Sequence, residues 1–485
     1  MPTTARSRRD HSAHELMESF ERRCLFDSVA WDGGGGDGAW ANPLNWNRGG
    51  VDVVPQNGDD VTINISPKGG VSFTAAAGVV TLNSLTTTRP LAVSGGSLSV
   101  VNAFSITSAA LSYSGGNLAG TPTLLNSTLS LTPAGASGVT FIAEGNSTLS
   151  GNLNAGQTLW VRGSNTGANA TLAIPATVTN AGTIRLESAG LNWQSNIGVA
   201  PGATLINTGS LQINLGSAGQ RLIAGDVRNQ GTFTVAPDVS AEISNNLGTF
   251  THAAGTITTG GGLRVFSGLI EYTGGSIIGA VQGSNVNVRI SATQSGTIAV
   301  DGSSALVSNI PVGPTLWVRG SNTGGNSVLH IPANYTNAGT IRMESIGQNW
   351  QSNIVIDPGA TLTNTGTIQS NLGAAGERSI FGSLTNTGNI ASAADSPVLI
   401  SGTFTAAGGI MSGPHYVVNS AVNVTADALT PTTINLIGNN TLQTNNRPGY
   451  TLWIHGSNPG ANATLTILEL RGIVKNVGGG KWVRA

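Results

Sequence analysis

Short stretches in which apolar and polar residues alternate recur along almost the whole chain, and turns rich in Gly, Asn and Ser separate them. Examples are V-V-T-L from Val79, L-A-V-S from Leu91 and T-L-S-L from Thr128. An alternation with a period of two places one side of a strand against a core. Strands of about five residues with frequent turns predict an all-β sandwich, propeller or solenoid.

One passage of the chain is written twice and begins a third time. It opens as T-L-W-V-R-G-S-N-T-G at Thr158 and at Thr315, and as T-L-W-I-H-G-S-N-P-G at Thr451. The first two copies continue through T-N-A-G-T-I-R, N-W-Q-S-N-I and P-G-A-T-L, whereas the third loses the pattern after Ile467. The likeness also extends upstream of the tryptophan, so we expect super-repeats of several turns each, at residues 111–269, 270–405 and, incompletely, 406–485.

The spacing of one turn motif inside the copies decides between the three architectures. The motif N-x-G is followed by an apolar residue two positions later, and its spacings are 27 and 22 residues in both copies, at Asn180, Asn207 and Asn229 and at Asn337, Asn364 and Asn386. A turn that returns every twenty-odd residues indicates the stacked rungs of a solenoid. The second copy is also 21 residues shorter than the first, which is about one rung. We therefore predict a right-handed parallel β-helix over residues 67–485, with the turn asparagines stacked as a structural ladder.

The start of the chain differs from the rest. Residues 1–26 hold much of the charge, and Leu16, Phe20 and Cys24 would line one side of a short helix, so this segment is predicted to be a helical or disordered leader. Residues 27–66 are rich in Trp and Gly, and the three rings of Trp31, Trp40 and Trp46 suit a module that covers the open end of a core.

Three short phrases resemble exported bacterial surface proteins. The leader phrase F-E-R-R-C-L-F is similar to the leader of large exported surface proteins, and the phrases W-x-N-P-L-N-W and P-Q-N-G-D-D-V-T-I resemble the opening module of autotransporter-like β-helix passengers. The N-x-G-x-I turns resemble the rung turns of filamentous-haemagglutinin-type adhesins. The resemblance implies export and a structural or adhesive role, and it assigns no binding residue.

The amino-acid composition argues against several classes of function. Charged residues make up 9% of the chain, against about 25% in a typical soluble domain, and the net charge is −1. No electrostatic field draws in nucleic acid, and we expect no nucleic-acid partner. The sequence contains no stretch of 18 apolar residues, so it predicts no membrane span. The single cysteine rules out a disulfide within the chain, so backbone pairing and packing must stabilise the fold.

The acidic residues of the N-terminal module raise the question of calcium. Asp32, Asp37, Asp59 and Asp60 are oxygen donors, and Ca²⁺ takes several of these. Their spacing matches neither an EF-hand nor the G-G-x-G-x-D repeat. Turn formation by Asp and Gly is the favoured interpretation, and we expect no resident metal or cofactor.

The repeated tryptophan loops are the candidate ligand sites. An aromatic ring beside amides suits a glycan, because the ring takes the apolar side of a sugar and the amides take its hydroxyls. The alternative is that each ring only packs against the next rung. The candidates are Trp160, Arg162, Asn165, Trp193, Trp317, Arg319, Asn322, Trp350, Trp453, His455 and Asn458.

The expected function is a non-enzymatic β-helix protein, extracellular or at the cell surface, with a structural or adhesive role. A glycan-binding solenoid is the first alternative, and a polysaccharide-degrading enzyme is the second. An enzyme needs a single constellation of acids and bases, whereas Glu187 and Glu344 recur with the repeat. Candidate partners are glycans or cell-envelope components, and the broken third copy suggests end-to-end self-association through an exposed C-terminal rung. The basic N-terminus lacks the apolar core of a standard signal peptide.

Overall fold

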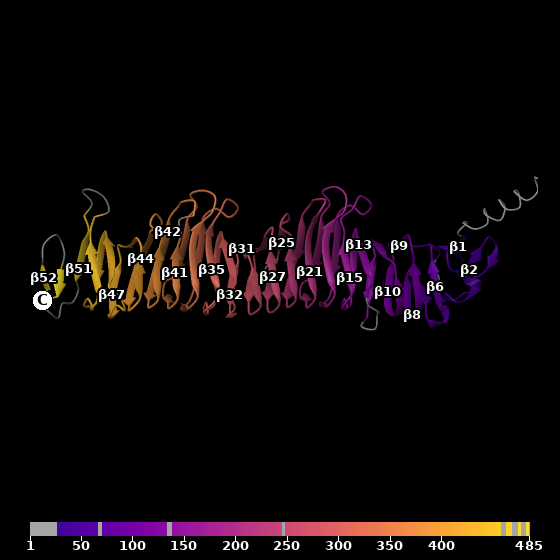
Figure 1. Ribbon diagram of the computed structural model, residues 1–485, viewed down its shortest axis with the longest axis horizontal. Coiled ribbons are helices and arrows are strands. Elements are labelled where there is room, and N and C mark those ends of the chain that lie inside the picture. Colours follow the sequence, from indigo (N-terminus) through magenta and orange to yellow (C-terminus); the bar gives the residue numbers. More distant parts are fainter. Residues whose placement is uncertain are drawn as a thin grey trace, which may run out of the picture. The chain divides into compact units, whose positions relative to one another are not determined.

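The chain forms two compact units in a computed structural model, residues 1–160 and 161–485. The structure describes residues 27–65, 70–132, 138–244, 248–371, 373–456 and 462–467, and the backbone of 474–476 and 482–484. Nearly every element is a short β-strand, and the described part of the chain contains no α-helix. Within each unit, Figure 1 shows the strands as a succession of stacked turns.

Unit 1 is built of two series of strands and two 3-10 turns, Pro43–Asn45 and Ala75–Ala77. The first series is β1 (Ser28–Trp31), β2 (Trp46–Arg48), β3 (Val51–Asp52), β4 (Asp60–Ile63), β7 (Ser84–Thr87), β9 (Phe104–Thr107), β11 (Thr123–Leu125), β13 (Thr140–Glu144) and β15 (Thr158–Val161). The second series is β5 (Val71–Phe73), β6 (Val79–Leu82), β8 (Leu91–Val100), β10 (Ala110–Ala119), β12 (Thr128–Leu131) and β14 (Asn146–Ser150).

Unit 2 contains three parallel sheets, A, B and C. Sheet A holds β18 (Thr183–Ser188), β21 (Ser210–Gly216), β24 (Thr232–Val235), β27 (Thr256–Thr259) and β30 (Ser276–Ile278). Sheet B holds β16 (Ala170–Ile174), β19 (Ser195–Val199), β22 (Arg221–Ala224), β25 (Ala241–Ser244), β28 (Leu263–Phe266), β31 (Ala280–Ser284), β33 (Thr297–Asp301), β35 (Thr315–Gly320), β38 (Thr340–Ser345), β41 (Thr367–Ser370), β43 (Asn389–Ser392) and β45 (Ile410–Ser412).

Sheet C continues furthest along the chain. It holds β17 (Val178–Asn180), β20 (Thr204–Asn207), β23 (Asp226–Asn229), β26 (Thr249–His252), β29 (Leu269–Tyr272), β32 (Asn287–Ile290), β34 (Ser303–Leu306), β36 (Ser327–Ile331), β37 (Tyr335–Asn337), β39 (Ser352–Ile356), β40 (Thr361–Asn364), β42 (Arg378–Asn386), β44 (Val398–Ala407), β46 (His415–Val418), β47 (Ala421–Ala426), β48 (Thr432–Ile437), β49 (Asn439–Leu442), β50 (Tyr450–Ile454) and β51 (Thr464–Ile467). An antiparallel pair, β52 (Val474–Asn476) and β53 (Trp482–Arg484), lies last.

Alternate residues of each strand point into a continuous apolar core. In β18, for example, Ile184 and Leu186 are fully buried while Arg185 and Glu187 point outward. The next rung repeats the arrangement with Leu211 and Ile213 buried. Because each rung covers only its neighbours, apolar residues at every second position are enough to build the core. The parallel β-helix predicted from the sequence is thus confirmed.

The turn asparagines lie one above another, as their spacing predicts. Asn180 pairs with Asn207, and Asn207 with Asn229, as direct neighbours in adjacent strands. Each side-chain amide donates to the next: the distance from Nδ2 to Oδ1 is 2.8 Å from Asn180 to Asn207 and 2.7 Å from Asn207 to Asn229. The ladder in copy one ends at His252, whose Nδ1 lies 3.2 Å from Asn229 Nδ2.

The second copy repeats this ladder. Asn337 donates to Asn364 and Asn364 to Asn386, each over 2.8 Å. This ladder ends on a backbone oxygen, because Asn386 Nδ2 donates to Ile410 O at 3.2 Å. The different endings reflect the extra rung: β27 lies between β24 and β30 in copy one, whereas β43 pairs directly with β45 in copy two.

The number of strands per rung changes along unit 2. Rungs of copy one supply a strand to each of sheets A, B and C, but sheet A receives none after β30. The following rung has only two strands, β33 and β34. Three strands per rung then return, and sheet C takes two of them, so it has two columns. Its first column comprises β36, β39, Arg378–Phe381 of β42, Val398–Ser401 of β44, β46, β48 and β50.

A cluster of aromatic rings occupies the start of unit 1. Trp31, Trp40 and Trp46 are fully buried, and Trp46 meets the other two rings edge-on at 4.8 and 4.7 Å. Phe73 packs against Trp40 at 5.2 Å. β1 pairs in parallel with β4 but antiparallel with β2, so the parallel stack is closed here by a meander. The predicted leader, residues 1–26, lies outside the described residues.

Within the described part of the chain, no helix is both long and apolar enough to cross a membrane.

Candidate binding surfaces

Each of the first two copies carries three loops on successive rungs of unit 2. Loop set one comprises residues 163–169, 189–194 and 217–220, and loop set two comprises 320–326, 346–351 and 373–377. Both sets rise above the strands in the view of Figure 1. Loop set one joins strands of sheet A to sheet B, whereas loop set two joins sheet B to sheet C. The loops therefore stack beside one another, as the rungs beneath them do.

The two tryptophan motifs of each copy meet in these loops. The indole Nε1 of Trp193 donates to Asn165 Oδ1 at 2.9 Å, and Trp350 donates to Asn322 at 2.8 Å. Both rings are half-buried, and both asparagines are exposed. Each asparagine thus fixes the orientation of a ring from the next rung. Sequence reasoning found all four residues but not this pairing.

A glycine allows the two loops to approach closely. A Cβ atom at Gly163 would lie 2.7 Å from Trp193 Cβ and 2.4 Å from Gln194 O, and Gly320 has the same contacts with Trp350 and Gln351. Real Cβ atoms do not come this close to other heavy atoms. The amide of Gly163 also donates to Ser195 Oγ at 3.1 Å. Glycine in W-V-R-G-S-N is therefore required by packing between rungs.

A buried arginine holds the third loop of each set. Arg221 is fully buried and donates to the carbonyl oxygens of Asn214, Ala218, Gly219 and Gln220, each at 3.0 Å, and to Ser188 Oγ at 2.9 Å. Arg378 occupies the same place in copy two and donates to Ser345 Oγ, Ala375 O and Glu377 O. Burial lowers the pKa of both guanidinium groups below the ordinary value. Carbonyl oxygens compensate each cation, so both arginines serve the loop structure.

The outward-facing tryptophans of the strands lie in different surroundings. Trp160 is half-buried in β15, and Arg162, which follows that strand, is also half-buried. The ring of Trp317 in β35 lies near two guanidinium groups, with its centroid 4.0 Å from Arg342 Cζ and 5.3 Å from Arg319 Cζ. Arg342 also pairs with Glu344 at 2.5 Å. An arginine covering the ring of Trp317 leaves less of it for a ligand.

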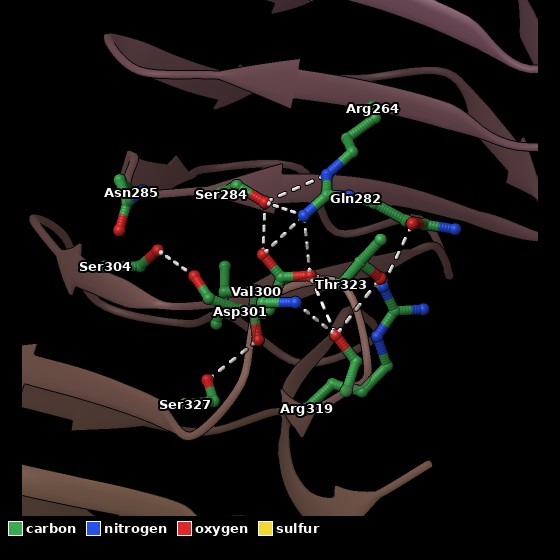
Figure 2. A network of polar contacts seen from close by, with 12 residues as sticks. Arg264, Gln282, Ser284, Asn285, Val300, Asp301, Ser304, Arg319, Thr323 and Ser327 are labelled. Carbon is green, nitrogen blue, oxygen red and sulfur yellow. Dashed lines mark hydrogen bonds and ion pairs between the residues drawn. The ribbon is translucent and has the colours of Figure 1, made fainter. Parts of the chain in front are cut away.

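Arg319 belongs to a buried polar network rather than to the surface (Figure 2). It is 5% exposed and donates to Gln282 Oε1 at 2.9 Å. The carboxylate of Asp301, 1% exposed, lies 3.6 Å from Arg319 and 3.2 Å from Arg264. Ser284 donates to the same carboxylate, and Ser321 does so at 3.3 Å. Burial lowers the pKa of Arg319, and the charge of Asp301 opposes this shift.

The third copy carries an exposed aromatic cluster. Trp453 in β50 is 49% exposed, and its ring lies 4.6 Å from that of His455. Tyr416 in β46 meets His455 edge-on at 5.9 Å. Asn458, the remaining candidate, and the predicted C-terminal assembly edge fall mainly outside the described residues.

Acidic residues of the N-terminal module stabilise turns of the chain by accepting hydrogen bonds from nearby backbone amides. Asp32 accepts from Gly34 N at 3.0 Å, and Asp37 accepts from Ala39 N and from two asparagine side chains. Asp59 pairs with Arg48, and burial raises the pKa of its carboxyl group. Among the residues that the structure describes, no group of three His, Cys, Asp or Glu side chains comes together as a metal site would require.

Corner residues with a left-handed backbone were missed by sequence reasoning. Asn126, Asn285 and Asn419 have φ of 51°, 53° and 49°, and each Oδ1 accepts from a backbone amide of the next rung. The signal was present in the sequence: each asparagine is followed, 17 or 19 residues later, by a glycine that also has positive φ. Asn and Gly tolerate this conformation, which sharp corners need.

Comparison with known proteins identifies no relative of this chain. No family model matches the chain, and neither a curated protein nor a solved structure matches it.

Proposed function

We propose that this is a non-enzymatic β-helix protein with a structural or adhesive role outside the cell or at its surface. Its setting would be that of the bacterial autotransporter-like passengers and filamentous-haemagglutinin-type adhesins that its turn and N-terminal phrases resemble. The observation that carries the proposal is the repetition of an entire loop set on a stacked scaffold. A repeated surface suits contact with a repetitive partner, because several weak contacts combine into strong attachment.

The non-enzymatic part of the proposal is supported by how the repeated carboxylates are used. Glu187 and Glu344 accept from Asn214 and Asn371, each at 2.8 Å, and both lie beside an arginine on the same strand. Asp301 is buried between two arginines. General acid–base chemistry needs a carboxyl group within reach of a substrate, and these groups are occupied by the scaffold.

Localisation tests the proposal. Cells of the source organism would be fractionated, and the protein followed by a specific antibody before and after protease treatment of intact cells. We expect it in the surface or medium fraction and expect the surface fraction to be cleaved. Recovery only in the cytosol, with protection from protease, would refute the proposal.

Glycan binding through the tryptophan loops is the second candidate. The favouring observation is that Trp193 and Trp350 are held in fixed orientations by an exposed amide, which is the pairing of ring and hydrogen-bonding group that a sugar needs. A glycan array would compare the wild type with a Trp193/Trp350→Ala variant and with a Trp160/Trp317/Trp453→Ala variant. Binding that only the loop variant loses would assign these loops, and no binding by the wild type would exclude them.

A further inference from the structure

The first column of sheet C presents an outer surface to which its strands contribute no Asp, Glu, Lys or Arg; its one histidine that faces outward, His330, lies 3.9 Å from Asp357. Its large outward-facing side chains define what we call the C-face strip: Val328, Val355, Phe381, Leu399, Tyr416 and Trp453. Phe381 is 40% exposed and Trp453 is 49% exposed. The outward-facing positions of these strands, all of them described, include no Asp, Glu, Lys or Arg.

The first copy shows that the fold does not require this surface. The strands β16, β19, β22 and β25 pair in the same registers as β36, β39, β42 and β44. The inward-facing residues agree between copies, as with Leu172 and Leu329 or Ile197 and Ile354.

Four outward-facing positions carry larger apolar residues in copy two, whereas Leu222 of copy one is replaced by Ser379 and Ala173 by His330. Where copy two has Val328, Val355, Phe381 and Leu399, copy one has Thr171, Gly198, Ala224 and Glu242. The β-helix therefore also forms with small or charged residues at these positions. Exposed apolar side chains carry a risk of aggregation and commonly mark an interaction site.

The dimensions of the strip favour a linear occupant. Seven strands at about 4.8 Å spacing give a length of roughly 29 Å, and two rows of outward side chains give a width of about 14 Å. The area is then roughly 400 Å², half of the ~800 Å² per partner that a standard protein interface buries. A long and narrow strip fits a single polymer chain better than a globular partner.

The residue types favour a sugar polymer without charge. Aromatic rings of Phe381, Tyr416 and Trp453 supply apolar contact area, and Asn435 lies beside Trp453 on the preceding strand. A polyuronate or another anionic chain would find no outward-facing Lys or Arg on these strands, and the Glu377 carboxylate, which accepts from Ser379 of β42, would repel it. We propose that the C-face strip binds one chain of a neutral polysaccharide lying along the axis of unit 2. This inference rests on the proposed adhesive role and names its ligand class.

Affinity electrophoresis of the full chain tests the proposal. The gels would contain a neutral β-glucan, a mannan or a galactan, with a polyuronate as the charged comparison. The test variant is Phe381→Ala with Leu399→Glu, because copy one carries Ala and Glu at the matching positions and the fold accepts them. A second variant, Trp453→Ala, removes the exposed ring, and Trp193→Ala serves as the loop control.

We expect at least one neutral polymer, and not the polyuronate, to retard the wild type. Both strip variants should weaken retardation about tenfold, equivalent to ~1.4 kcal/mol, with unchanged circular dichroism, and the loop control should behave as the wild type. Three results would overturn the inference: no retardation by any neutral polymer, loss of retardation in the loop control alone, or a wild-type dimer in sedimentation that the strip variants abolish. Localisation is independent, so a surface protein that is not retarded refutes the strip and leaves the proposed function standing.

Discussion

The asparagine ladder makes a quantitative prediction about stability. Asn364 is fully buried and takes part in three hydrogen bonds: it accepts from Asn337 at 2.8 Å and donates to Asn386 at 2.8 Å and to Asn389 O at 3.0 Å. A neutral hydrogen bond contributes about 1 kcal/mol net. Asn364→Ala should therefore lower the free energy of unfolding by about 3 kcal/mol.

The position of each amide in the ladder gives a graded control. Asn337 begins the second ladder, and it only donates, to Asn364 and to Thr367 O. Asn337→Ala should cost about 2 kcal/mol, because two hydrogen bonds are lost. Thr363, which points outward from the same strand as Asn364, gives the surface control: Thr363→Ser should stay within about 0.5 kcal/mol of the wild type.

Equilibrium unfolding in urea, followed by far-UV circular dichroism, measures these differences. The slope of the transition must agree between variants before the midpoints are compared, since a repeat protein can unfold in parts. Equal midpoints for Asn364→Ala and Thr363→Ser would show that the amide ladder does not stabilise the rungs, and the reasoning would be refuted.

Three further predictions concern buried polar groups. Burial lowers the pKa of His252 and of His415 below the ordinary value of about 6.5. Below that pH the unfolded chain therefore binds protons that the folded chain does not. The free energy of unfolding should be highest above about pH 6.5 and should decrease as the pH is lowered through this value. Unfolding at pH 7.5 and pH 5 should show this loss, and His252→Asn, which substitutes another amide in the ladder, should reduce it; an unchanged pH dependence would contradict the assignment. Arg221→Met should leave several carbonyl oxygens unpaired and cost about 3 kcal/mol in urea unfolding, with faster proteolysis within residues 214–220, and a normal cleavage pattern would count against this role. Asp301→Asn should cost about 3 kcal/mol because it leaves the buried Arg319 and the half-buried Arg264 without a counter-charge. A neutral outcome in the same assay would show that the serines and Gln282 suffice.

The rung spacing was predictable because it depends only on local turn chemistry. Asn180, Asn207 and Asn229 sit in the same turn motif, and the spacings of 27 and 22 residues became the registers of the sheet. A period in the sequence is enough to place residues on the same column when each rung touches only its neighbours.

The side-chain partners of the candidate site were not predictable in the same way. The bond between Trp193 and Asn165 joins loops 28 residues apart, and loop lengths do not reveal which atoms meet. The burial of Arg319 depends on Asp301, which replaces the Glu144 of copy one, so the two copies of an identical motif have different surroundings. The strip on sheet C needed the strand registers before its positions could be compared between copies.

The direction of the amide ladder has a consequence for how such a chain can grow. Each Nδ2 donates toward the next rung, so the first amide, Asn180 or Asn337, receives nothing from the preceding rung, and the last must find an acceptor, a histidine nitrogen in one copy and a backbone oxygen in the other. A block that carries its own beginning and its own acceptor can be duplicated as a whole without leaving an amide nitrogen short of an acceptor at the junction. A gene segment encoding one complete ladder is therefore a natural unit of expansion, and chain length can change in evolution by whole blocks while the core stays continuous.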